Sequence, residues 1–298
     1  MRKEYIPRPD YIARIKPFMG RDIIKVLVGQ RRTGKSYLLY QLMDEIKKED
    51  PDAAVIYINK EEYAYRDILT WEDLYRYVTR ESGNAGYCYL FIDEIQEIKE
   101  FERALRTLLY ENRYDIYCTG SNARMLSGDL ATLLSGRYVE QRVYSLSYPE
   151  FLMFHGFENS NDAFIRYMRF GGMPWLAKTG LDEEAAYEYL HNLYNTIILK
   201  DVVERFRVRN VAILKNLILF LAGNAGSIIS AKKISEYLKS QRTDISVKVV
   251  IEYLAHLADA MLVSQVRRTD IEGKRVFEIG EKYYFGDTGI RNSLVPFR

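Results

Sequence analysis

The chain contains the stretch Gly29-Gln30-Arg31-Arg32-Thr33-Gly34-Lys35-Ser36, which matches the phosphate-binding pattern G-x-x-x-x-G-K-[ST] at every fixed position. An apolar, β-branched run at residues 23–28 precedes it, and apolar residues at helical spacing follow at 37–43. In a strand–loop–helix context, backbone N–H groups and the helix dipole point at one anion. We therefore predict that these eight residues bind a nucleoside triphosphate.

Within this loop the side chains have different expected roles. Lys35 is expected to reach the β- and γ-phosphates, and the Ser36 hydroxyl to take a place on Mg²⁺. Arg31 and Arg32 stand where many such loops have small residues. Solvent exposure is the default expectation for both, and contact with the nucleotide or a partner is the alternative.

Composition narrows the class of protein. The chain has 298 residues, enough for two domains, with 48% hydrophobic and 28% charged residues, as in ordinary globular proteins. A net charge of +2 gives no global attraction to nucleic acid or acidic membranes. No apolar run approaches the length of a membrane span, so no membrane partner is expected.

Cysteine and histidine usage narrows the class of protein further. The two cysteines, Cys88 and Cys118, lie in apolar, strand-like runs, and their small number excludes a disulfide scaffold. Two buried thiols fit a reducing cytoplasm, which is the location we expect. The three histidines show no zinc-ligand spacing.

The first half of the chain alternates strands and helices. Apolar runs at 53–59, 87–92 and 115–119 predict further strands, and amphipathic stretches at 71–78 and 102–109 predict helices. A last strand is expected around Arg142-Val143-Tyr144. This alternation predicts an α/β fold, a parallel P-loop sheet with helices on both faces, in a domain of residues 1–147.

The rest of the chain reads as mostly helical. Apolar periodicity at 185–203 belongs to an expected helical linker or lid region, residues 148–210. A further helix is expected at 211–222, then one capped by Ser230 and one capped by Thr243 or Asp244. A hairpin with strands at 261–266 and 275–279 would follow. Two short helices and a β-wing predict a winged helix in residues 211–298.

Two carboxylates end one of the expected strands. In Tyr89-Leu90-Phe91-Ile92-Asp93-Glu94, four apolar residues precede the acids, which a parallel sheet would bring to the same edge as the phosphate loop. Asp93 would then hold Mg²⁺ together with Ser36. Glu94 is the candidate that orients or deprotonates the attacking water. The alternative is that both acids have no catalytic role and only mark the point where the strand reaches solvent.

Two other polar sites are candidates. At the end of the next strand, Ser121 or Asn122 could hydrogen-bond the γ-phosphate or the attacking water, although a polar turn with an Asn cap would look the same. Arg137, in Leu134-Ser135-Gly136-Arg137-Tyr138, could neutralise charge on the transferring phosphoryl group, within the chain or across a subunit interface. A surface arginine is the alternative.

Together these motifs resemble those of prokaryotic AAA-type ATPases with a poorly characterised, winged-helix C-terminal region. The resemblance rests on the Walker A loop, the Walker B run Phe91-Ile92-Asp93-Glu94-Ile95-Gln96, Thr119-Gly120-Ser121-Asn122 and four later segments. These are Ser135-Gly136-Arg137-Tyr138, Tyr148-Pro149-Glu150-Phe151, Gly171-Gly172-Met173-Pro174 and Tyr284-Phe285-Gly286-Asp287-Thr288-Gly289. It implies ATP as the nucleotide and Arg137 as an arginine finger. Many such proteins continue into a nuclease-like fold, and nothing up to Arg298 predicts nuclease activity.

Two functions remain open at this point. The first is an ATP hydrolase that moves its C-terminal domain, with DNA as a candidate partner. The second is a slow switch in which ATP or ADP controls a protein partner. A homo-oligomer is compatible with both. A P-loop kinase fits less well, because Glu94 beside Asp93 suits activation of water. Lys248, Arg242, Arg267, Arg268, Lys274 and Arg275 make the expected recognition surface modestly basic, although Glu252 lies among them.

Overall fold

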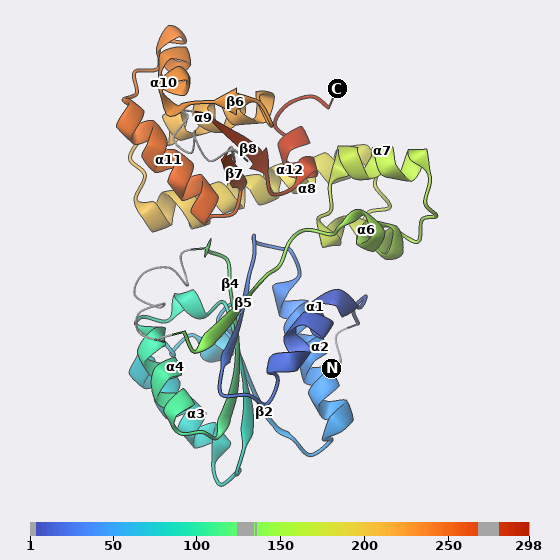
Figure 1. The fold of residues 1–298 in the computed structure, drawn as a ribbon, viewed down its shortest axis with the longest axis vertical. Coiled ribbons are helices and arrows are strands. Elements are labelled where there is room, and N and C mark those ends of the chain that lie inside the picture. Colours follow the sequence, from blue (N-terminus) through green and yellow to red (C-terminus); the bar gives the residue numbers. More distant parts are fainter. Residues whose placement is uncertain (1–3, 124–133, 135, 268–279, 298) are drawn as a thin grey trace, which may run out of the picture. The chain divides into compact units, whose positions relative to one another are not determined.

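The structure is a computed structural model that describes residues 4–123, 134, 136–267 and 280–297. The chain divides into two compact units. One comprises residues 1–29 and 33–143, and the other comprises residues 30–32 and 144–298. Figure 1 shows both units.

The first unit is a parallel sheet with helices. Its strands are β1 (Ile24–Val28), β2 (Ala54–Asn59), β3 (Cys88–Asp93), β4 (Tyr114–Gly120) and β5 (Tyr138–Arg142). Its α-helices are α1 (Pro9–Ile15), α2 (Lys35–Glu49), α3 (Trp71–Ser82) and α4 (Phe101–Tyr110), with short 3-10 turns at Lys16–Phe18, Tyr63–Tyr65 and Ile95–Glu97.

Its five strands are all parallel and lie in the order β2-β3-β4-β1-β5. Figure 1 shows α3 and α4 on one face of the sheet and α1 and α2 on the other. With both faces covered, every residue of β1 and β4 is buried. Cys88 and Cys118 are buried in β3 and β4, and burial raises the pKa of Cys118 to about 12. The predicted α/β fold is confirmed.

The last strand lies earlier than predicted. We expected it around Arg142-Val143-Tyr144, whereas β5 runs from Tyr138 to Arg142. It pairs with β1 alone, and two of its five residues are exposed. An edge strand is held by backbone hydrogen bonds and needs few apolar side chains. The apolar pair Val143-Tyr144 therefore led to a predicted strand that begins too late in the sequence.

A buried ion pair anchors the edge of the sheet where the strands begin. The Lys25 ammonium pairs with the Asp115 carboxylate, and both side chains are almost fully buried. Asp115 also accepts hydrogen bonds from the Tyr117 hydroxyl at 2.7 Å and the Gly20 amide at 2.8 Å. Burial lowers the pKa of Lys25, and the Asp115 carboxylate opposes that shift. With these partners the charge is satisfied inside an otherwise apolar strand.

The second unit is mostly helical, as predicted. Its α-helices are α6 (Tyr148–His155), α7 (Asn161–Phe170), α8 (Glu183–Thr196), α9 (Val211–Gly223), α10 (Ala231–Ser240), α11 (Val247–Asp259) and α12 (Thr288–Asn292). A 3-10 segment covers Pro174–Lys178, and α8 continues into a π-helix, η6 (Ile197–Glu204). Its strands are β6 (Ile228–Ile229), β7 (Val263–Arg267) and β8 (Glu281–Phe285).

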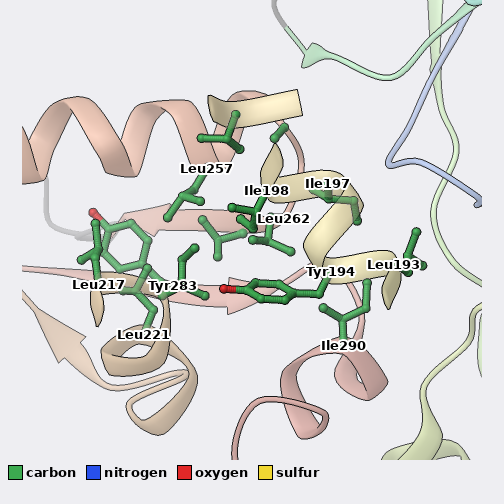
Figure 2. Packing of buried hydrophobic residues seen from close by; sticks show 14 of the residues in the cluster. Leu193, Tyr194, Ile197, Ile198, Leu217, Leu221, Leu257, Leu262, Tyr283 and Ile290 are labelled. Carbon is green, nitrogen blue, oxygen red and sulfur yellow. The ribbon is translucent and has the colours of Figure 1, made fainter. Parts of the chain in front are cut away.

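A single hydrophobic cluster holds these elements together. It includes side chains from α8, the π-helix, α9, α11 and the strands. Figure 2 shows Tyr194, Ile198, Leu217, Leu257 and other members of this cluster. Residues on both sides of position 210 therefore share a core, and the predicted division at that position stays a prediction.

The last part of this unit contains the two predicted short helices and the first predicted strand, together with two strands, β6 and β8, that were not predicted. After α9 come β6, α10, α11 and the antiparallel strands β7 and β8, in the sheet order β6-β8-β7. Ser230 caps α10 as predicted, by accepting a hydrogen bond from Lys233. The cap of α11 is Ser246, so the expected cap at Thr243 or Asp244 is wrong. The expected strand at 275–279 lies outside the described residues.

One buried carboxylate connects two of the family-like motifs. Asp287 is 4% exposed and accepts hydrogen bonds from the amide of Gly172 at 2.8 Å and that of Ile290 at 3.1 Å. Burial raises the pKa of Asp287, and these backbone donors oppose that shift. The Gly171-Gly172 and Asp287-Thr288-Gly289 segments are thus held together by hydrogen bonds to one carboxylate. A structural role in packing accounts for both motifs.

Among the described residues, no helix is both long and apolar enough to cross a membrane.

Candidate functional site

The Gly29–Ser36 loop joins β1 to α2 in a conformation that depends on its glycines. Gly34 has φ +95°, in the left-handed region that favours glycine, and directly precedes α2. A Cβ at Gly29 would lie 2.3 Å from the carbonyl oxygen of Val143, so no side chain fits there. The first amides of α2 have no partner within the helix and face this loop, an arrangement suited to an anion.

Lys35 is folded back onto this loop. Its side chain is 4% exposed, and Nζ donates a hydrogen bond to the carbonyl oxygen of Gly29 at 2.9 Å. The same ammonium lies 3.7 Å from the Glu94 carboxylate. A cation held at the mouth of a loop lined by backbone amides is placed to meet a phosphate.

Strand β3 ends at Asp93, whose carboxylate is 2% exposed and held on both oxygens. Oδ1 accepts a hydrogen bond from the Thr119 hydroxyl, and Oδ2 accepts one from the Tyr57 hydroxyl at 3.2 Å. Burial raises the pKa of Asp93, while hydrogen bonds from Ser36 and Thr119 oppose the shift. The structure therefore brings Ser36 and Asp93 together, as the predicted metal site requires.

Glu94 leaves the strand in a left-handed conformation, with φ 55° and ψ 52°. Such a conformation costs a residue with a side chain about 1–2 kcal/mol. The Glu94 amide offsets part of this cost by donating to the Thr119 hydroxyl at 3.0 Å. The Glu94 carboxylate accepts a hydrogen bond from Gln96, whereas that of Asp93 accepts hydrogen bonds from Thr119 and Tyr57. The two acids consequently have different surroundings and can have different roles.

These residues fit a nucleotide and a divalent cation. The loop offers backbone amides and a buried ammonium, and a few ångströms away lie a hydroxyl and a buried carboxylate. A desolvated carboxylate whose pKa is raised by burial gains from a nearby cation. Hydroxyl and carboxylate oxygens are ligands that Mg²⁺ accepts together with phosphate oxygens and water.

The end of β4 completes the polar edge. The loop and β4 are joined where the Gly29 amide donates to the Gly120 carbonyl oxygen at 3.2 Å. Ser121 follows, 1% exposed, and lies 3.4 Å from the side-chain nitrogen of Gln96. Asn122 comes next, partly buried, at the same carboxyl edge of the sheet. Its role as a sensor stays a prediction.

Arg137 lies at the opposite edge. Its carbonyl oxygen accepts a hydrogen bond from the Ile24 amide at 3.0 Å, and β1 must then run to Gly29 before the loop begins. Five residues of parallel strand span about 16 Å, which is longer than an arginine side chain. The exposed guanidinium instead lies 4.9 Å from the centre of the Tyr110 ring. This register separates Arg137 from the phosphate loop of its own chain, and its role as an arginine finger stays a prediction.

One expectation about the loop is wrong. Arg31 is not solvent-exposed: its side chain is 14% exposed and forms a bidentate ion pair with Asp201, at 3.0 Å from Nε and 2.9 Å from Nη2. Asp201 is 2% exposed and lies in the π-helix. Gln30–Arg32 group with this unit. Arg32 is exposed as expected.

Sequence reasoning missed three residues that support the loop and the acids. Arg8 is 3% exposed and donates from its guanidinium to the Thr33 carbonyl oxygen at 2.9 Å. Tyr57 and Thr119 hold the Asp93 carboxylate. A signal existed for Thr119, since it is a polar residue at the end of an apolar strand. No signal pointed to Arg8 or Tyr57.

Two family models match the chain. A model of the AAA domain matches residues 21–152, and a model of a domain of unknown function, DUF8612, matches residues 161–298. An uncharacterized protein of Haemophilus influenzae is 34% identical, over 99% of this chain and 75% of its own length. One of Methanocaldococcus jannaschii is 31% identical, over 85% of this chain and 60% of its own length.

The loop, the two acids and these matches define a class. The chain belongs to the prokaryotic AAA-type P-loop ATPases, a nucleotide-binding family. Among solved structures, the ORC1 protein of Aeropyrum pernix in complex with DNA is similar, at 13% identity over 98% of this chain and 93% of that one, with a TM-score of 0.42. A similarity this weak supports no inference about ligands or partners.

Proposed function

We propose that this protein binds ATP with Mg²⁺, hydrolyses it, and couples the nucleotide state to its C-terminal unit. The observation that carries the proposal is the convergence of Lys35, Ser36, Asp93 and Glu94 at one edge of the parallel sheet, beside a glycine loop. Ligands of open α/β sheets bind at this edge. ATP rather than another nucleotide is what the family implies.

Each side chain then has a role. Gln30 to Gly34 would surround the phosphates with backbone amides, and Lys35 would exchange its bond to Gly29 for the β- and γ-phosphates. Mg²⁺, held by Ser36 and Asp93, would neutralise phosphate charge. Glu94 would accept a proton from the attacking water. The oxygen of that water would bond to the γ-phosphorus while the bond between the γ-phosphorus and the β–γ bridging oxygen breaks. Asn122 would orient that water.

Arg137 would act on the nucleotide of a neighbouring copy. The distance between Arg137 and the phosphate loop of its own chain supports action across a subunit interface. An arginine that stabilises the transferring phosphoryl group would then come from another subunit. We therefore propose a homo-oligomer in which the amino edge of one sheet faces the carboxyl edge of the next. Heterologous contacts of this kind close into rings when the rotation allows.

Phosphate release from ATP tests the proposal. Wild-type protein should release phosphate in the presence of Mg²⁺, and Lys35→Ala should neither bind nor hydrolyse ATP, because the cation that meets the phosphates is gone. Lys47→Ala is the control: Lys47 lies at the far end of the same helix, where its ammonium donates to the carbonyl oxygens of Pro51 and Ala53. Equal rates in wild type and Lys35→Ala would refute hydrolysis at this site.

A slow switch is the second candidate. In the described conformation the Glu94 carboxylate accepts a bond from Gln96 and lies near Lys35, so it is engaged before any water arrives. Slow turnover would follow if these contacts persist with nucleotide bound. A low steady-state rate that DNA leaves unchanged favours the switch, whereas a rate that rises with DNA favours the hydrolase acting on DNA.

We also propose that residues 211–298 are a winged helix, following a helical region from about residue 148. The exposed positions on α11 include Val247, Lys248, Ile251 and Glu252, which carry no net charge. This supports a protein partner at least as well as DNA. Arg242 and Arg267 are exposed nearby and could contact phosphates, whereas Arg268, Lys274 and Arg275 lie outside the described residues. A cytoplasmic location stays a prediction.

DNA binding can be measured by fluorescence anisotropy at several salt concentrations. Contacts to phosphates make affinity fall as salt rises, by about 0.9 log units per tenfold change for each phosphate neutralised. Absence of binding at low salt would leave a protein as the partner.

A further inference from the structure

Thr119 links the two acids of the candidate site, and its position follows from the sheet. Strands β3 and β4 are neighbours, with Ile92 opposite Cys118, so the next residues along, Asp93 and Thr119, are also side by side. Thr119 is completely buried. Its side chain therefore has to satisfy its hydrogen-bonding capacity with the groups around it.

Its hydroxyl makes one bond to each acid. Oγ1 accepts the hydrogen bond from the Glu94 amide at 3.0 Å and donates its own hydrogen to Asp93 Oδ1. A hydroxyl can do both at once because it has one donor and two acceptor lone pairs. The Glu94 amide lies where the chain turns into the left-handed conformation, so the same hydroxyl fixes the direction of that turn.

We propose that Thr119 is the positioning residue of this site: its single hydroxyl sets the Asp93 carboxylate for the cation and the Glu94 backbone for water activation. The inference rests on the proposed function. Tyr57 donates to the other oxygen of Asp93. Thr119 bonds both Asp93 and the Glu94 backbone and so couples the two acids.

The test compares Thr119→Val, which keeps the size of the side chain, with Thr119→Ser, which keeps the hydroxyl. Thr107→Val is the matched control, since Thr107 is exposed on α4 and its hydroxyl donates to the Arg103 carbonyl oxygen of the same helix. Two quantities are measured: the ATP hydrolysis rate, and the equilibrium affinity for a fluorescent ATP analogue with Mg²⁺ and with EDTA.

Loss of a residue that orients a metal ligand typically costs 10–100-fold, and we expect kcat of Thr119→Val to fall by about that factor. The affinity gained from Mg²⁺ should fall by about tenfold, whereas affinity in EDTA should stay within about twofold, because the phosphate loop is untouched. Thr119→Ser should recover kcat to within about threefold. A merely structural role would lower affinity equally with and without Mg²⁺.

Folding is followed by thermal unfolding, and Thr119→Ala is the second variant should Thr119→Val not fold. Hydrolysis and Mg²⁺-dependent affinity equal to wild type in a folded variant without the hydroxyl would overturn the role of Thr119. Equal loss in Thr119→Ser and Thr119→Val would overturn it as well. Absence of ATP binding by the wild-type protein would instead refute the proposed function, and the inference would fall with it.

Discussion

Replacing Arg137 by alanine tests whether catalysis needs a second subunit. The register of β5 on β1 puts Tyr138 opposite Ile24, and the preceding Arg137 bonds the Ile24 amide, about 16 Å along the strand from the phosphate loop. Among the described residues of its own chain, the side chain stacks on Tyr110, an exposed cation–π contact worth about 0.5–1 kcal/mol. Arginine fingers contribute about 10³–10⁵ in kcat. Arg137→Ala should therefore lose at least about 10³-fold in hydrolysis with little loss of stability.

The assay is ATP hydrolysis by Arg137→Ala, by Lys35→Ala and by an equal mixture of the two. Each variant alone should be inactive, one for lack of the finger and the other for lack of the nucleotide. In the mixture about a quarter of heterologous interfaces pair an intact loop with an intact finger, so about a quarter of wild-type activity should return. Arg106→Ala is the control, because Arg106 also lies over the Tyr110 ring. Full activity of Arg137→Ala alone, or no recovery in the mixture, would refute the reasoning.

Three further changes separate chemistry from stability. Glu94→Gln should keep ATP affinity within about threefold and lower kcat by about 10²–10⁴, as expected for loss of a general base; equal rates would remove Glu94 from that role. Asp287→Ala should destabilise the second unit by about 2–6 kcal/mol in urea unfolding, since two buried amides lose their acceptor, while the exposed Asp244→Ala should change little. Asp201→Asn should cost about 3–5 kcal/mol, because Arg31 loses a bidentate carboxylate, and wild-type stability would contradict that pairing.

The sequence predicted the sheet and the convergence of the loop with the acids, because these depend on short-range patterns. Glycines, Lys35 and Ser36 are adjacent along the chain, and an apolar strand that ends in Asp93 must reach the carboxyl edge of a parallel sheet. The cap at Ser230 follows from the same local chemistry.

The features that were missed depend on contacts between distant parts of the chain. Arg31 is paired with Asp201, 170 residues later, and no local pattern in the loop indicates this. A single carboxylate inside the apolar run at 197–203 was the one available hint. Thr119 acquires its two bonds from the strand order, which the sequence alone leaves open. The cap of α11 is Ser246 and not Thr243 or Asp244. Several residues that can cap a helix lie close together here, so the sequence pattern does not identify which one forms the cap.

Calorimetric titration of the wild-type protein with a non-hydrolysable ATP analogue and Mg²⁺ tests the central claim most directly. If a loop of backbone amides and Lys35 meets the phosphates beside Asp93, one nucleotide should bind per chain, and Lys35→Ala should weaken binding by at least about tenfold. No heat from the wild-type protein, or equal binding by Lys35→Ala, would contradict the account.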